Sequence, residues 1–345
     1  MSNTKLTIKE VARRLDVSTA TISNAFNRPD QLSAKKRAEV LAACQEMGYA
    51  GPNKAARSLR RGKTNIIALV LPDSLEYMVT DPVASQLMQG VAKVTKDSEA
   101  NVLLFSGSND SVNEVVDFVD GFICYGSPRN QALLKQLSQI NKRVVTIDFD
   151  IENAPSVNID NTQAAYQSAL LALDRAVKNP AILGLRLVDV EHTCVVGDNP
   201  LLDSEYSISH RRLDGYLQAI EQVGLSISNE AIWHIPESTH ECAIIAVQEA
   251  LNAPQRPDVL LCMSDIIALT AMQEALRLGI RIPEDIRVVG FDGIDIAKRY
   301  HPTLTTVQQF SANKGEIATR MFLDGDTESQ MLDFELVPGG STLRS

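Results

Sequence analysis

Small polar side chains recur at helical spacing after Ser18 and could hydrogen-bond with the edges of nucleic-acid bases. In the stretch STATISNAFN, one side of the predicted helix is apolar and consists of Ile22, Ala25 and Phe26. The opposite side carries Thr19, Ala20, Thr21, Ser23 and Asn24. Short hydroxyl and amide groups near the start of a helix are suited to contacting base pairs in the major groove. The chemistry predicted here is non-covalent recognition of DNA.

Two further helices would hold this one in place. Thr7 is placed to cap a first helix, Ser18 the second and Ser33 a third that runs to Met47. The inward positions of the first helix are Ile8, Val11, Ala12 and Leu15, and those of the third are Ala38, Val40, Leu41, Cys44 and Met47. A tight turn at Asp16 would make the first pair a helix-turn-helix. An ordinary helical hairpin is the alternative interpretation.

The charge of the chain is divided between its two parts. Residues 1–64 hold 13 Lys and Arg against five Asp and Glu, and the remaining residues hold 20 against 38. A basic segment binds phosphates by releasing counterions, whereas an acidic body is repelled by DNA. This division favours DNA contact through the first part alone; a merely solvated basic surface is the alternative.

Four motifs, in this order, make the chain resemble the LacI/GalR transcriptional regulators. They are TIKEVARRLDVSTATIS from Thr7, GYAGPNKAARSLRRGKTN from Gly48, MSDIIALTAMQEALRLGIRIPEDIRVVGFDG from Met263 and HPTLTTV from His301. The resemblance implies an all-α helix-turn-helix head at residues 1–50 and a hinge helix and linker at 51–64. It also implies a two-lobed α/β body like that of periplasmic binding proteins at 65–345.

The resemblance implies a DNA contact surface on the head and the hinge. The segment Asn53–Arg61 is too short to be a stable helix alone. In the family it pairs with its copy in a dimer and pushes a leucine into the minor groove, and Leu59 matches that leucine. The predicted DNA-binding residues are Thr7, Ser18, Thr19, Ala20, Thr21, Ser23, Asn24, Asn27, Tyr49, Asn53, Ala56, Arg57, Leu59 and Arg60. Plain packing is the alternative for Tyr49 and Leu59.

From Asn65 onward, buried strands alternate with helices, which is typical of parallel sheets covered on both faces. We expect one lobe of about residues 65–160 and 306–326, and a second of about 161–305 and 327–345. A helix is predicted over residues 161–176. Only Asp110–Phe118 separates the second and third strands, so the family's crossover helix is expected to be reduced to a turn or so.

Polar residues at strand ends nominate a binding site, because ligands of such sheets bind outside the carboxyl ends of the strands. They are Asp73, Ser74, Asp148, Ser264, Asp265 and Asp292. By the resemblance, Arg212 matches the arginine that grips a polar group of the effector, and Asp148 and Asp292 match acidic positions that accept its hydrogen bonds. Such a set suits a hydroxyl-rich molecule. Helix capping is the alternative role for Asp265.

Two positions depart from the family pattern. Ser238 stands where an aromatic ring often stacks on the ligand, and Ser264 stands where an asparagine is usual. A flat ligand would therefore lack its stacking platform, unless Trp233 or Tyr77 replaces it.

Other function classes lack their signatures. No nucleophile elbow, phosphate-binding glycine loop or metal-ligand spacing is visible, so no catalysis, cofactor or metal site is expected. The five cysteines are odd in number and lack C-x-x-C spacing, which predicts free thiols. The absence of an export signal and of a long apolar run predicts a cytoplasmic protein without membrane contact.

The sequence thus predicts a repressor that binds a palindromic operator as a homodimer, with tetramers possible, and that responds to a small sugar-like effector. The alternative hypothesis is a DNA-binding regulator of the same fold that is controlled by a protein partner or has no small-molecule effector. The identity of the effector, its direction of action and the operator are left open.

Overall fold

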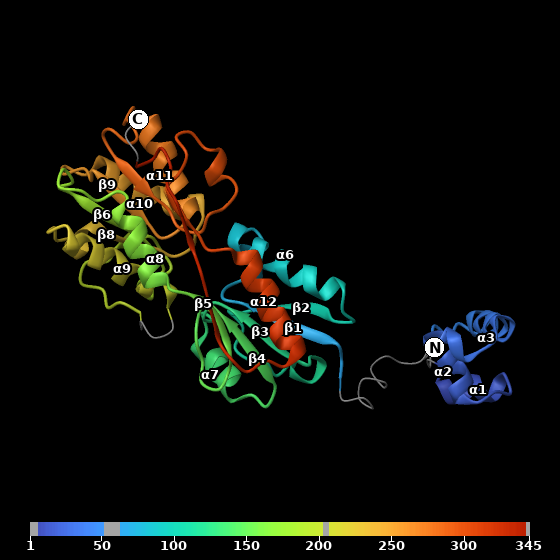
Figure 1. Ribbon diagram of the computed structural model, residues 1–345. Coiled ribbons are helices and arrows are strands. Elements are labelled where there is room, and N and C mark those ends of the chain that lie inside the picture. The colour runs from blue at the N-terminus through green and yellow to red at the C-terminus, as the bar shows by residue number, and fades with distance from the viewer. Residues whose placement is uncertain (1–5, 52–62, 203–206, 343–345) are drawn as a thin grey trace. The chain divides into compact units, whose positions relative to one another are not determined.

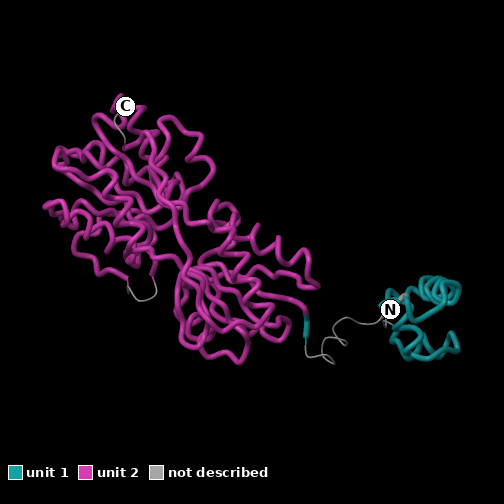
Figure 2. Tube along the Cα trace, in the orientation of Figure 1, with its two compact units in different colours: residues 1–64 teal, residues 65–345 magenta. Residues whose placement is uncertain are grey.

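The structure is a computed structural model that describes residues 6–51, 63–202 and 207–342. The chain divides into two compact units, Met1–Thr64 and Asn65–Ser345 (Figure 2). The predicted hinge helix, with Asn53, Ala56, Arg57, Leu59 and Arg60, lies outside the described residues. No helix within the described ranges is long and apolar enough to cross a membrane.

The first unit, called the head below, is built from the predicted helices α1 (Ile8–Arg14), α2 (Thr19–Asn27) and α3 (Ala34–Glu46). They enclose a small core of Val11, Ala12, Ile22, Ala25, Val40, Cys44 and Tyr49. Ala38 was expected to face this core but is exposed. The reason is geometric, because residues two apart on a helix do not share a face, and Val40 faces inward.

In the described residues of the second unit, called the body below, two large sheets each form the centre of a lobe, and a small sheet pairs β11 with β13 (Figure 1). The sheet of the first lobe is parallel and has the order β12-β5-β4-β3-β1-β2, so β2 lies at its edge. Its strands are β1 (Ile66–Leu71), β2 (Asn101–Ser106), β3 (Gly121–Tyr125), β4 (Arg143–Ile147), β5 (Ser156–Ile159) and β12 (Gln330–Leu332).

Helices cover both faces of this sheet. Leu69 packs in one core with α6 (Pro82–Lys96) and α12 (Ser311–Asp324), and Val70 packs on the other face with α7 (Gln131–Gln139). Between β2 and β3 the described chain forms only the 3₁₀ turn η2 (Val116–Phe118), as the short connection predicted. Phe118, the last residue of this turn, is 63% exposed.

The sheet of the second lobe has the order β10-β9-β6-β8-β7. Its strands are β6 (Pro180–Leu185), β7 (Cys194–Val195), β8 (Ile232–Ile235), β9 (Val259–Cys262) and β10 (Arg287–Val289). All pairs are parallel except the short edge pair of β7 and β8. The helices are α8 (Asn161–Leu170) and α9 (Ile208–Gln222), which pack together, and α10 (His240–Asn252) and α11 (Asp265–Arg277), which also pack together.

Helix α8 ends at Leu170, before the predicted end at Ala176. The side chain of Asp174 accepts a hydrogen bond from the Ala176 amide at 2.8 Å and forms an ion pair with Arg287 at 2.8 Å. A carboxylate that hydrogen-bonds its own backbone offers the chain an alternative to the helical ladder. The helix therefore stops before this turn.

The chain passes from one lobe to the other again near its end. β11 (Thr306–Gln308) lies beside β10 and pairs with β13 (Glu335–Val337), and α12 follows in the first lobe. The expectation that residues 327–345 belong to the second lobe is wrong for β12, which pairs with β5 of the first sheet. Met331 of β12 is 68% exposed, so this edge strand carried little hydrophobic signal.

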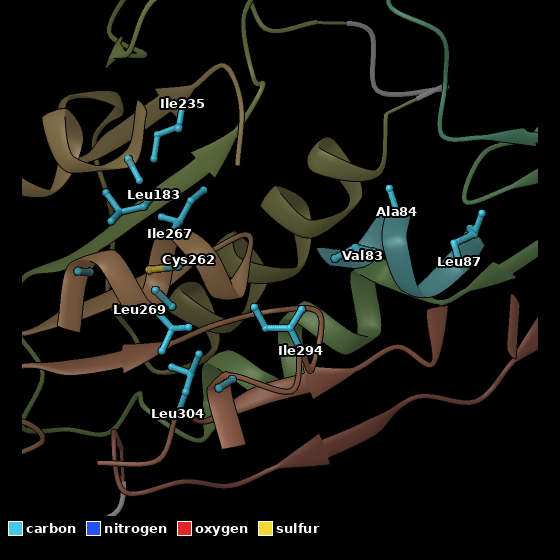
Figure 3. Close-up of a cluster of buried hydrophobic side chains, with 14 of the residues drawn as sticks. Val83, Ala84, Leu87, Leu183, Ile235, Cys262, Ile267, Leu269, Ile294 and Leu304 are labelled. Atoms are coloured by element: carbon cyan, nitrogen blue, oxygen red, sulfur yellow. The ribbon is translucent and has the colours of Figure 1, made fainter. Parts of the chain in front are cut away.

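One buried apolar cluster contains residues from both lobes (Figure 3). Val83, Ala84 and Leu87 of α6 belong to it together with Leu183 of β6 and Ile267 of α11. The two lobes therefore share part of their apolar core.

Candidate nucleic-acid interface and effector cleft

Hydrogen bonds at the helix starts set the geometry of the head. Thr7 and Glu10 form a capping box, in which the Thr7 amide donates to Glu10 Oε2 at 2.7 Å and Thr7 Oγ1 accepts from the Glu10 amide at 3.4 Å. These bonds hold the pKa of the Glu10 carboxyl below its usual value. Ser18 Oγ caps α2 by accepting from the Thr21 amide at 3.0 Å. Thr7 and Ser18 thus fix the two helices that the prediction assigned to DNA contact.

Polar side chains of α2 lie on the surface of the head. Ile22 and Ala25 are the buried residues of this helix. Thr19, Ala20 and Asn27 are exposed, and Thr21, Ser23 and Asn24 are partly exposed. The predicted contact residues of α2 therefore form a surface strip that small polar groups dominate.

Tyr49 lies in the core of the head. It is 7% exposed, and its ring meets the Phe26 ring edge-on with 6.0 Å between the centroids. Its hydroxyl is enclosed without a hydrogen-bond partner among the described residues, and burial raises its pKa. This placement agrees with the packing alternative for Tyr49 and not with a contact to DNA, because the hydroxyl cannot reach the surface.

In the body, Arg212 of α9 is held rigidly at the carboxyl ends of the strands. Its Nε donates to Asn161 Oδ1 at 3.1 Å, and its Nη1 donates to the Met263 carbonyl at 2.6 Å. Nη1 also lies 3.5 Å from Asp292 Oδ1, and the guanidinium carbon is 3.6 Å from the centre of the Phe291 ring. Three polar contacts and a cation–π contact leave this buried cation with one orientation.

A chain of polar contacts links Arg212 to the first lobe. Asp292 Oδ1 accepts from Gln309 Nε2 at 2.7 Å, and Gln309 Oε1 accepts from Lys314 Nζ at 2.8 Å. Lys314 Nζ donates in turn to Asp148 Oδ1 at 2.6 Å. The contacts from Asp148 to Arg212, called the inter-lobe relay below, therefore bring together three of the predicted site residues.

Burial perturbs the ionisable groups of the relay. Burial raises the pKa of Asp292, with the nearby Arg212 opposing the shift. Burial also lowers the pKa of Lys314, with Asp148 opposing it. Both directions follow from the cost of placing a charge in a low-dielectric interior. Each charge is tolerated there because an opposite charge is in contact with it.

Ser264 and Asp265 have local structural roles at the start of α11. Ser264 caps the helix by accepting from the Ile267 amide at 3.2 Å, and its Oγ lies 2.6 Å from Ser238 Oγ. Asp265 accepts from the Ile294 amide at 2.9 Å and from the Thr306 hydroxyl. Burial raises its pKa to about 6. Asp265 therefore braces the loop after β10, and the capping role considered for it belongs to Ser264.

Asp73 and Ser74 belong to a second group, at the end of β1. Asp73 pairs with Arg129 at 3.2 Å, and Arg129 also reaches Glu191 of the second lobe at 3.2 Å. Ser74 caps the short helix α5 (Leu75–Met78). The hydroxyl of Tyr77 in this helix accepts from the Ser238 amide at 2.9 Å. This group, called the outer group below, also joins the two lobes.

Four polar residues near these groups were not predicted from the sequence, namely Arg129, Arg186, Gln309 and Lys314. Lys314 had a detectable signal, since the buried face of α12 includes Ser311, Lys314, Gly315 and Ala318, and a lysine on such a face needs a partner. Arg129 and Gln309 lie outside helices and strands, where no periodicity distinguishes them.

Comparisons with known proteins agree with this architecture. The model of bacterial regulatory proteins of the lacI family matches residues 7–53, and a periplasmic binding protein-like domain matches residues 193–342. The HTH-type transcriptional regulator Rv3575c of Mycobacterium tuberculosis is 33% identical, with 97% of this chain and 96% of the relative covered. The HTH-type transcriptional repressor CytR of Escherichia coli is 30% identical, with 98% and 97% covered.

Among solved structures, the complex of the transcriptional regulator CelR with cellobiose has a TM-score of 0.65 and 21% identity, and the match covers 97% of this chain and 99% of that one. At this identity the likeness concerns the fold. The two sequence relatives extend over nearly the whole chain, and both are regulators. The chain therefore belongs to the LacI family of bacterial transcriptional regulators and is a DNA-binding protein, not an enzyme.

Proposed function

We propose that this regulator is a repressor that binds a palindromic operator as a homodimer and responds to a small polar molecule in the cleft of the body. The observation that carries the proposal is the surface strip on α2. Thr19, Ala20 and Asn24 lie outside the core of a capped helix pair, on a head whose sequence is basic. Such side chains can contact base edges, and the basic surroundings attract the phosphates.

A dimer is supported by the edge of the first sheet. Val102 and Leu104 of the edge strand β2 are 36% and 37% exposed, and they line a shallow groove with Leu69, Met88 and Val91. An apolar edge strand is an aggregation hazard unless something covers it. A second copy of the chain is the occupant that a palindromic operator requires. Leu104→Arg is expected to sediment as a monomer where the wild type sediments as a dimer; an unchanged dimer would move the interface elsewhere.

An effector site is supported by the inter-lobe relay. Arg212 of the second lobe and Asp148 of the first lobe lie at the carboxyl ends of strands, and both are buried. Ligands of two-lobed α/β proteins bind at this position. The complex of CelR with cellobiose shows that a protein of this fold takes a sugar. A hydroxyl-rich metabolite is the class that a mixture of guanidinium and carboxylate groups would hold.

We infer that the hinge segment transmits the signal. Asn53–Arg61 contains Leu59 among arginines and is too short to be a stable helix alone. Two copies could pair as helices on DNA and insert the leucines into the minor groove. The effector would then act by changing the spacing of the two segments. This requires a difference in binding free energy between the two states of about 1 to 3 kcal/mol.

The experiment has a DNA part and a ligand part. Selection of bound sequences from a random DNA pool should yield two inverted half-sites, and their absence would contradict the proposal. A thermal-shift screen of metabolites should find a ligand that stabilises the body, by about 2.7 kcal/mol at 100 times its dissociation constant. Arg212→Ala should lose this response and keep operator affinity without ligand, since Arg212 lies in the body and not in the head.

A second candidate is a regulator of the same fold that is controlled by a protein partner. The observation that favours it is the relay itself, because Lys314 and Gln309 already occupy oxygens of Asp148 and Asp292. The same screen separates the two candidates. If no metabolite shifts the melting temperature, while a protein recovered with the regulator changes its operator affinity, the second candidate replaces the first.

A further inference from the structure

Arg186 stands immediately after β6, at the carboxyl end of a central strand of the second sheet. Its backbone has a φ of 51°, in the left-handed region that residues other than glycine rarely adopt. Residues held in such conformations occur preferentially where function requires a fixed geometry. The conformation of Arg186 therefore calls for an explanation in terms of what its side chain does.

The unusual backbone at Arg186 is fixed from both sides. The Arg186 amide donates to the Ile235 carbonyl at 2.8 Å. The next two amides, of Leu187 and Val188, donate to Nδ1 of His234 at 2.9 and 3.3 Å. His234 is fully buried, and its other ring nitrogen lies 3.0 Å from the Val190 carbonyl. A neutral imidazole thus clamps the loop that carries Arg186.

The guanidinium of Arg186 has no hydrogen bond or ion pair among the described residues, although the residue is half-buried. The other buried or partly buried cations at the strand ends differ. Arg129 pairs with Asp73, Arg212 pairs with Asp292, and Lys314 pairs with Asp148. A partly desolvated cation without a counter-ion is unfavourable, and the cost is removed when an anion binds it.

The surroundings of Arg186 do not supply that anion. Burial lowers its pKa; the nearby carboxylates Asp73 and Asp189 oppose the shift, and Arg129 adds to it. Asp73 is already engaged by Arg129 and by the Ser74 amide, so it cannot neutralise two guanidinium groups. Arg186 and Arg129 therefore present two like charges from different lobes, while Asp73 is committed to Arg129 and the exposed Asp189 forms no ion pair with Arg186.

We propose that Arg186 is the anion-recognition residue of the effector cleft, and that the effector is a small hydroxylated molecule carrying a carboxylate or phosphate group. This inference rests on the proposed function. The planar fork of an arginine binds either oxyanion with two parallel hydrogen bonds, which a neutral sugar cannot match. The anion would bridge Arg186 and Arg129 and so contribute to holding the lobes together.

The test compares matched ligands on the full-length protein. Glucose, glucuronate and glucose 6-phosphate form one set, and ribose with ribose 5-phosphate forms another. Thermal shift and calorimetry are run at equal ionic strength, with inorganic phosphate and chloride as ion controls. For at least one parent, an anionic form should bind the wild type about tenfold more tightly than the neutral form. Arg186→Gln should abolish that advantage, and Arg186→Lys should retain part of it. The two acids distinguish a carboxylate from a phosphate.

Arg175→Gln is the matched control, because Arg175 is an exposed arginine that precedes the amino end of β6, away from the cleft. It should respond as the wild type does. Arg186→Gln loses no described contact of its side chain, so its melting temperature without ligand should not fall. Equal responses of the wild type and Arg186→Gln to every anion would overturn the inference. If neutral sugars then still bind in an Arg212-dependent way, the effector site of the proposed function stands and only the anionic ligand class fails.

Discussion

Some polar side chains of α2 hydrogen-bond with the backbone of the head, and others lie on its surface without such a role. Ser18 caps the helix, and Asn27 Nδ2 donates to the Ser23 carbonyl at 2.9 Å. Thr19 and Asn24 stand beside them on the surface strip. A side chain already bonded to its own backbone has less to offer a base, so Asn24 is the stronger candidate for base readout.

Asn24→Ala is expected to relax the preference at one base pair of each half-site. The affinity for the operator should fall by about 1 to 3 kcal/mol per contact, because a bidentate amide contact to a base edge is lost. Affinity for random DNA should change little, since phosphate contacts are untouched. Fluorescence anisotropy on both DNAs measures the effect. An equal loss on both would show that Asn24 contacts no base.

A residue-scale pH dependence follows from His234. Burial lowers its pKa, so between this lowered value and about 6.5 the unfolded chain binds a proton that the folded chain does not. The stability that neutral His234 provides is therefore present above about pH 6.5 and is lost as the pH falls below it. His234→Asn keeps an acceptor for the Leu187 amide and does not titrate. Urea unfolding at about pH 7.5 and about pH 5.5 should show a larger loss of stability in the wild type than in the variant. Equal losses would show that protonation of His234 does not cause the change in stability over this pH range.

At the scale of elements, short helices in this chain depend on their caps and on their neighbours. α1 has seven residues and is closed by the Thr7–Glu10 capping box, and α2 is oriented by the core around Ile22. The hinge segment Asn53–Arg61 begins with Asn53, a possible N-cap, but Ala56 stands where a capping box would have Glu or Gln. Its helix is therefore expected to need a twin segment and DNA, because isolated helices of fewer than about 12 residues are marginal in water.

Leu59→Ala is the element-scale test of this proposal. Operator affinity and DNA bending should both decrease, because the apolar wedge that holds the minor groove open is removed. Effector affinity of the DNA-free protein should stay unchanged. Electrophoretic bending assays and calorimetry measure the two effects. Hydrogen exchange adds a direct comparison: amides of residues 55–60 should be protected in the operator complex and not in the free protein. Protection in both would mean that the hinge does not fold upon DNA binding.

At the scale of the whole molecule, polar contacts between described residues join the two lobes of the body at three places. They are the inter-lobe relay through Lys314, the outer group around Arg129, and the ion pair of Arg211 with Asp150 at 3.1 Å. Of these three described contacts, the relay alone is fully enclosed. Exposed ion pairs contribute little, so the relay is the contact whose loss should change the relation between the lobes.

Lys314→Met tests the relay. It leaves Asp148 buried without its cation, which should cost about 3 to 5 kcal/mol of unfolding free energy. Adding Asp148→Leu should recover most of this loss, because an apolar pair can replace a buried ion pair. Lys93→Met is the matched control. Lys93 of α6 pairs at 2.7 Å with Glu316, which lies on α12 as Lys314 does, but the Lys93 side chain is 69% exposed. Urea unfolding should show that Lys93→Met lowers the free energy of unfolding by about 0 to 1 kcal/mol. Similar losses of unfolding free energy for Lys314→Met and Lys93→Met would contradict the conclusion that the buried relay contributes more than an exposed ion pair.

Local sequence signals were sufficient for most of the fold. The caps Thr7, Ser18 and Ser33 and the alternation of strands with helices depend on interactions within a few residues. The shortened connection at Asp110–Phe118 could be predicted because its length excludes a long helix. β12 escaped prediction, because a short exposed edge strand lacks the apolar run that marks buried strands.

The sequence by itself determined that the head has a helix-turn-helix, that the body has two lobes, and that Asp148, Arg212 and Asp292 stand at strand ends or helix starts. Only the tertiary structure decided which polar groups meet. Asp148 and Lys314 are 166 residues apart in the chain, and no local rule brings a carboxylate to so distant a lysine. The same holds for the His234 clamp, 47 residues from the Leu187 amide that it binds. The physical reason is that a helix or strand is selected by its neighbours in sequence, whereas a buried charge is stabilised by whatever the packed sheets place against it.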